Sequence, residues 1–123
     1  MQRLILLVAG VLLGINAYAQ TTEDKILGKW TNPDKSRVIE FVKNGDNYEA
    51  IIRESDEASF VGKKQITNLS FEKDGAYEDG TVHILQRNKT ADCTTHLLSI
   101  DELELKVSFG LMSKSVIWTR VDN

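Results

Sequence analysis

The sequence contains one cysteine, Cys93, so no disulfide bond can form within the chain. Stability must therefore come from core packing and strand pairing. We expect Cys93 to be a buried, inert thiol rather than a reactive or intermolecularly paired one, because free cysteine is among the most buried residue types. No second cysteine and no histidine at ligand spacing accompanies it. The sequence therefore offers no set of metal ligands and indicates no cofactor.

Positive charge is in slight deficit. The chain has 15 Lys and Arg against 18 Asp and Glu, which gives a formal net charge of -3. No concentrated basic face is visible along the sequence. Because nucleic acids and anionic membrane surfaces both select such a face, the composition argues against either as a partner.

Long apolar runs are absent except at the N-terminus, where residues 4–15 are almost entirely apolar. The run follows Arg3 and precedes Ala17-Tyr18-Ala19, which is the order of a cleavable signal peptide. A membrane anchor would need about 20 apolar residues, and this run is shorter. We expect residues 1–19 to be removed and residues 20–123 to work as one soluble domain, periplasmic or secreted, with no membrane contact.

No segment after Gln20 has a convincing helical period. Short segments rich in branched and aromatic residues alternate with Gly, Asn and Asp, which is typical of successive hairpins. The clearest strand is Glu102 to Phe109, in which apolar and polar residues alternate strictly. Eight strands are predicted, at residues 27–31, 37–43, 48–53, 66–71, 80–85, 91–98, 102–109 and 114–121.

Eight sequential strands without a crossover helix leave two exposed edges unless the sheet closes on itself. A two-sheet sandwich is the alternative, but its Greek-key connections need long excursions, and the only long loop spans residues 55–62. We therefore predict an all-β fold, a small eight-stranded antiparallel up-and-down barrel.

The two ends of the barrel domain carry a recognisable pair of motifs. Gly28-Lys29-Trp30 stands on the first predicted strand, and Trp118-Thr119-Arg120 stands on the last. This resembles the lipocalin or calycin arrangement, and the resemblance implies that Gly28, Trp30, Trp118 and Arg120 close the barrel, with the arginine stacked on Trp30. We expect Arg120→Ala to cost about 1 to 3 kcal/mol, and Arg37→Ala, on a solvated strand, to cost much less.

Nearly the whole of residues 20–123 resembles a bacterial exported family called domain of unknown function 2147. The resemblance is carried by residues 26–30, Tyr48 with Ile51, Gly80 spaced to Cys93 through a hairpin, and residues 114–121. It implies a calycin-like barrel outside the cytoplasm and no assigned activity. The chain departs from the family pattern in three places: a shortened loop at residues 55–61, Ile84-Leu85 in place of the usual Asp-Pro, and Lys114 where arginine is common.

The candidates for chemistry are few. His83 and Cys93 face each other if the hairpin turn centres near Asn88, and a cross-strand imidazole and thiol could activate a nucleophile or bind a metal. A register slip of one residue would separate them. His96 is expected to point outward, and the acidic residues at 54–57 and 101–102 are interpreted as solubilising charge.

The barrel interior is the remaining candidate site. Five apolar residues are predicted to line it: Ile39, Phe41, Leu105, Val107 and Phe109. Eight strands enclose either a packed core or a cavity for one small ligand. Three functions follow: binding of a small apolar or amphipathic ligand, a packed module that meets a protein partner or another copy, and, most remotely, an enzyme or metal site at His83 and Cys93. The sequence does not determine the oligomeric state.

Overall fold

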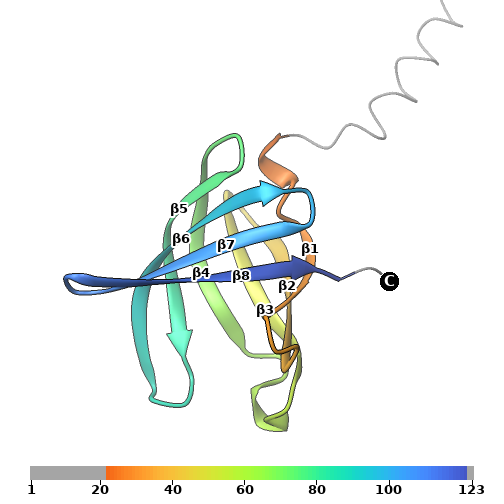
Figure 1. Cartoon of the computed structure of the whole chain (residues 1–123), viewed down its shortest axis with the longest axis vertical. Coiled ribbons are helices and arrows are strands. Elements are labelled where there is room, and N and C mark those ends of the chain that lie inside the picture. The colour runs from red at the N-terminus through yellow and green to blue at the C-terminus, as the bar shows by residue number, and fades with distance from the viewer. Residues whose placement is uncertain (1–21, 122–123) are drawn as a thin grey trace, which may run out of the picture.

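The computed structural model describes residues 22–121, which form one β-barrel (Figure 1). The expected signal peptide lies outside the described residues. No helix within residues 22–121 is long and apolar enough to cross a membrane. The elements are η1 (Thr22–Asp24), β1 (Gly28–Thr31), β2 (Arg37–Asn44), β3 (Asn47–Ser55), η2 (Ala58–Phe60), β4 (Lys64–Lys73), β5 (Ala76–Ile84), β6 (Lys89–Ser99), β7 (Glu102–Phe109) and β8 (Met112–Arg120).

Each strand pairs antiparallel with the next, and β8 returns to pair with β1, so the sheet is a closed barrel. The closing pairs are Trp30 with Arg120 and Thr31 with Thr119. The predicted eight-stranded up-and-down barrel is thus confirmed, and the sandwich is excluded.

Five strands, β3, β4, β5, β6 and β8, begin earlier than the sequence predicts, and β5 and β8 show two different reasons. β5 starts at Ala76 instead of residue 80, because a register shift between Tyr77 and Gly80 interrupts the alternation. β8 starts at Met112, because Gly110 and Leu111 alone make the turn from β7.

One end of the barrel is closed by the N-terminal segment. Figure 1 shows η1 at this end, beside the turns that follow β4 and β6. The Tyr48 hydroxyl donates a hydrogen bond to Asp24, and the Tyr77 hydroxyl donates one to the Glu23 carbonyl. The two tyrosine rings are buried and meet edge to face at 5.4 Å. Buried aromatic rings therefore fill this half of the interior, which we call the closed end.

The opposite end, which we call the mouth, is formed by the connections that follow β1, β3, β5 and β7. Antiparallel connections alternate between the two ends of such a barrel, so these four lie together. The connections after β5 and β7 are residues 85–88 and 110–111. In Figure 1 the turn between β7 and β8 projects past the other strands.

The seam between β1 and β8 is held by Arg120. Its guanidinium lies 4.3 Å from the centroid of the fully buried Trp30 ring. Three of its nitrogens donate to backbone carbonyls, Nε to Ile100 at 2.7 Å, Nη1 to Leu27 at 2.9 Å and Nη2 to Lys25 at 2.8 Å. This is the contact that the sequence predicts between its two ends, and it also ties down the segment before β1.

Gly28 makes room for this arginine. Its φ is +117°, a region that L residues with a side chain rarely adopt, and a Cβ atom there would lie 2.9 Å from Nη1 of Arg120. The Trp30 indole is held in place by a second contact, because its Nε1 donates a hydrogen bond to the Ile26 carbonyl at 2.9 Å. The Gly-x-Trp spacing therefore places two features against the same guanidinium: a residue without a side chain, which leaves space for it, and an indole ring, on which it stacks.

Arg37 differs from expectation. It is half-buried, its Nη1 donates to Gln65 Oε1 at 2.6 Å, and its guanidinium carbon lies 5.3 Å from the centroid of the Phe60 ring. The shift of register between Val38 and Ile39 accompanies this placement at the start of β2. The expectation of a solvated Arg37 is therefore wrong, and this residue is unsuitable as a neutral control.

Candidate functional site

The five predicted lining residues divide into two groups along the barrel. Ile39, Phe41 and Leu105 are buried in the core, and Val107 packs against that core while partly exposed. Phe109 is 48% exposed. It lies outside the enclosed interior because the β7–β8 hairpin extends past the strands that would have covered it.

A hollow of about 470 Å³ lies at the mouth, where the ends of β5 and β7 face the start of β8. Its lining residues are Ile84, Gln86, Arg87, Phe109 and Lys114. Ile84 and Phe109 supply apolar surface, and the two basic residues supply positive charge. We call these five residues the mouth hollow.

The two cations of the mouth hollow are exposed and have no partner within the described part of the chain. Neither Arg87 nor Lys114 makes a side-chain hydrogen bond or an ion pair there. Some other surface cations do, such as Lys64, which pairs with Glu49 at 3.2 Å. Unpaired cations beside apolar surface can bind the two parts of an amphipathic anion.

Two buried polar atoms lie deeper on the inner face of the same strands. Thr95 Oγ1 and Trp118 Nε1 have no hydrogen-bond partner among residues 22–121, and their residues are only 3% and 6% exposed. Both face inward, and their strand partners on β7 are Leu105 and Leu103. An indole N–H can only donate, so an acceptor atom is what this site lacks. A buried group left unpaired costs about 1 to 3 kcal/mol.

His83 and Cys93 do not form a site. His83 pairs with Thr90, whereas Cys93 pairs with Gly80. The turn occupies residues 85–88 and so centres earlier than Asn88, which moves the two residues apart in register. The prediction that they face each other is wrong.

The two side chains also have separate surroundings. The His83 ring lies on the outer side, 3.0 Å from Thr67 Oγ1, and Cys93 is buried inside. Burial raises the pKa of the Cys93 thiol to about 12, which disfavours the thiolate needed by a nucleophile or a metal ligand. His96 is exposed, as predicted.

No cluster of three or more His, Cys, Asp or Glu side chains that could hold a metal ion occurs in residues 22–121. The acidic residues at 54–57 and 101–102 are mostly exposed. Glu54 lines a second hollow, described below. Of the five residues of the mouth hollow, Phe109 was predicted to line a ligand site. The other four were not predicted, because Ile84 and Lys114 come from hairpins thirty residues apart and share no motif.

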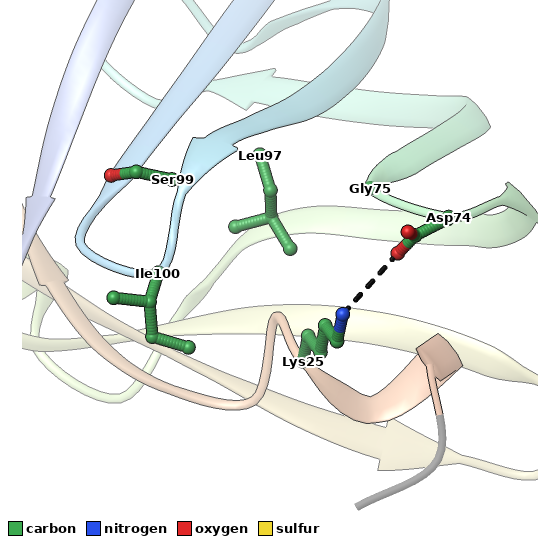
Figure 2. A pocket seen from close by; sticks show the side chains of 6 residues that line it. All are labelled: Lys25, Asp74, Gly75, Leu97, Ser99 and Ile100. Carbon is green, nitrogen blue, oxygen red and sulfur yellow. Dashed lines mark hydrogen bonds and ion pairs between the residues drawn. The ribbon is translucent and has the colours of Figure 1, made fainter.

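Two other hollows lie on the surface. The first, of about 270 Å³, is at the closed end, and Figure 2 shows its apolar residues Leu97 and Ile100 near the ion pair of Lys25 and Asp74. That pair, at 3.4 Å, already satisfies the charged groups. The second, of about 460 Å³, runs along the seam of β1 and β8, and we call it the seam groove; it is lined by Thr31, Asn32, Pro33, Lys35, Val38, Glu54, Thr119, Arg120 and Val121.

Comparison with known proteins gave one family and one solved structure. The family model described as "Uncharacterized protein conserved in bacteria (DUF2147)" matches residues 28–120. Protein HP1028 from Helicobacter pylori, described as belonging to the lipocalin family, superposes with a TM-score of 0.67 at 16% identity, over 80% of this chain and 84% of that one. No curated protein matches the sequence. The structural likeness extends to the fold, which is lipocalin-like.

Proposed function

Because the chain belongs to the bacterial family DUF2147, whose description assigns no activity, we propose a function from the geometry of the barrel. The protein binds a small amphipathic anion, with the apolar part of the ligand in the mouth hollow and its acidic group between Arg87 and Lys114. Eight-stranded barrels of this kind are able to hold one small ligand. The observation that carries the proposal is the pair of unpartnered cations beside apolar side chains.

The size and lining of the mouth hollow support this assignment. Ligand pockets usually measure about 300 to 1,000 Å³, and the mouth hollow measures about 470 Å³. The exposed ring of Phe109 and the half-buried Ile84 can cover a short alkyl chain or a ring. A carboxylate, sulfonate or phosphate on the same molecule can then reach both cations.

The unpartnered donors inside the barrel give a second line of support. Val107 and Val116 are partly exposed although they face inward, so the inner face is accessible beyond the rim. Thr95 Oγ1 and Trp118 Nε1 lie further along this face. A ligand that carries a second acceptor at its inner end would gain a hydrogen bond that the protein alone lacks.

Competition between decanoate and 1-decanol tests the proposal. The two molecules share an apolar chain and differ in the charge of the head group, and each can be titrated against a bound fluorescent anilinonaphthalene sulfonate. We expect decanoate to bind about tenfold more tightly or better, since a hydrogen bond to a charged group contributes about 1.5 to 3 kcal/mol. Lys114→Ala should remove most of that preference.

Lys106→Ala is the matched control. Lys106 is an exposed lysine on β7 whose side chain points away from the interior. Its loss should leave the preference for decanoate unchanged. Equal binding of the two ligands by the unaltered protein, or equal effects of the two lysine variants, would exclude the mouth hollow as an anion site.

We also propose that the protein is exported and acts in the periplasm or medium. The support is the sequence alone: Arg3, the apolar run at residues 4–15 and the triplet Ala17-Tyr18-Ala19. The mass of the protein recovered from the expressing bacterium tests it. A chain that begins at Gln20 in a soluble extracytoplasmic fraction is expected, and an intact N-terminus in the membrane fraction would mean that the run is an anchor.

A further inference from the structure

β8 has a partner along only part of its outer edge. It pairs with β7 from Met112 to Thr119, but it pairs with β1 only at Thr119 and Arg120. Residues 112–118 therefore have a neighbouring strand on one side only. Figure 1 shows the tip of the β7–β8 hairpin extending beyond the body of the barrel. An unpaired edge of this length is able to accept another strand.

The backbone groups that face outward along this edge follow from the pairing. The N–H of Val121 donates to the Lys29 carbonyl of β1, so it points away from β7. Successive residues of a strand point their backbone groups to opposite sides. The N–H and C=O groups of Ser113, Ser115 and Ile117 therefore point to the unpaired side, while those of the residues between them bond to β7.

The two ends of this edge carry an exposed apolar tip and a hollow. At one end, the hairpin tip exposes Leu111 completely, at 108%, and Met112 at 74%. At the other end is the seam groove, where β1 turns away and leaves a hollow of about 460 Å³ with Pro33 and Val38 in its wall. An apolar tip and a hollow with both apolar and polar lining residues therefore lie on the same molecule, separated by the unpaired edge.

We propose that the protein associates as a two-fold symmetric dimer in which β8 of one copy pairs antiparallel with β8 of the other, centred on Ser115. In this register Ser115 pairs with its own counterpart, and Ser113 of each copy pairs with Ile117 of the other, so the outward N–H and C=O groups of all three residues bond. Lys114 stands opposite Val116, so no like charges face each other directly across the pair.

The same register brings each hairpin tip to the other copy's seam groove. Met112 of one copy lies opposite Trp118, and Leu111 reaches the position of Thr119, where β1 already occupies the edge. The incoming tip must leave the plane of the sheet there, and the seam groove lies at that point. We infer that the partner is a second copy of the chain, because a two-fold axis lets each copy supply both the hairpin tip and the seam groove. The inference is independent of ligand binding.

Ser115→Pro is the sharpest variant. The proline removes an N–H that points away from β7, so the β7–β8 pairing retains its hydrogen bonds, and proline is tolerated on edge strands for this reason. Ser115→Ala keeps the N–H and is the matched control. In sedimentation or light scattering of the purified protein, the unaltered chain and Ser115→Ala should show a mass that rises with concentration to twice that of one chain, and Ser115→Pro should stay at one.

A cysteine at the two-fold axis provides a test that does not depend on the proline variant folding. Ser115→Cys should form a cross-linked dimer under mild oxidation, since paired strands bring the two Cα atoms within disulfide range. Thr94→Cys, an exposed position in the middle of the sheet, should not. A protein that stays monomeric up to about 200 μM would overturn the proposal. So would a dimer that survives in a folded Ser115→Pro, or equal cross-linking of both cysteine variants.

Discussion

Replacing Arg120 with alanine should lower the free energy of unfolding by about 3 kcal/mol, and the structure supplies the reasons. The guanidinium lies 4.3 Å from the centroid of the buried Trp30 ring, and a shielded cation–π contact contributes up to about 2 kcal/mol. The carbonyls of Leu27 and Lys25 lose charged donors at the same time. Each such hydrogen bond contributes about 1.5 to 3 kcal/mol, although the losses overlap and water replaces part of them.

Urea unfolding followed by tryptophan fluorescence measures this change. Arg53→Ala is the matched control, because Arg53 is an exposed arginine whose Nε donates to Glu40 at 2.8 Å on the outer surface. A surface pair of this kind contributes about 0 to 1 kcal/mol. The loss of unfolding free energy in Arg120→Lys should lie between the losses in Arg120→Ala and Arg53→Ala. The lysine ammonium keeps the charge but lacks the planar guanidinium that donates to three carbonyls.

This reasoning would be refuted if Arg120→Ala lowered the free energy of unfolding by less than about 1 kcal/mol and by no more than Arg53→Ala does. The seam would then be held by backbone pairing alone, through the two residue pairs between β1 and β8. A large loss in Arg120→Ala that Arg120→Lys fully restores would assign the effect to charge and not to the stacked, three-fold hydrogen-bonded geometry.

Two further changes are predicted from the packing of the interior. Gly80→Ala should lower stability by about 1 to 3 kcal/mol in the same urea assay, because its Cβ would lie 2.8 Å from both Cys93 Sγ and Leu69 Cδ1; a neutral effect would mean that the core is loosely packed there. Burial raises the pKa of Cys93 from 9.0 to about 12. The contribution of the buried thiol to the free energy of unfolding is therefore complete below pH 9 and is lost as pH rises toward 12, at up to about 1.4 kcal/mol per pH unit. Cys93→Ser should remove this loss between pH 9 and 10, and an unchanged pH profile would contradict the burial argument.

The bounds of a strand could be predicted from the sequence wherever one of its faces is apolar and the other polar. β7 was predicted with its observed bounds, Glu102–Phe109, because apolar and polar residues alternate without interruption. β5 was not, because Asp79 adopts a φ of +63° beside the register shift at Gly80, and this breaks the alternation. Period-two patterns find a strand, but they do not reveal a bulge inside it.

The register of the middle hairpin could not be predicted for a different reason. Residues 86–90 are all polar, so nothing in the sequence marks where the turn begins. The turn lies at 85–88, and this shift is enough to move Cys93 from His83 to Gly80. The spacing of Gly80 to Cys93 acquires a physical meaning only in the structure, where the missing side chain of one makes room for the thiol of the other.

Residues of the family resemblance are mostly explained by closure and packing. Gly28, Trp30 and Arg120 hold the seam, and Gly80 with Cys93 packs the interior. These residues maintain the barrel and do not distinguish one ligand from another. Recognition of a particular ligand must therefore depend on side chains other than these.

Two of the three departures from the pattern that the family resemblance implies lie where such differences would act. The family resemblance implies an aspartate at position 84 and an arginine at position 114, and the Ile84 and Lys114 that stand there both line the mouth hollow. An isoleucine at this position removes a carboxylate that would pair with the cations or repel an anionic ligand, and it adds apolar surface beside Phe109. Lys114 keeps the positive charge. The substitutions therefore make this mouth more apolar without making it less cationic, which is the combination that an amphipathic anion requires.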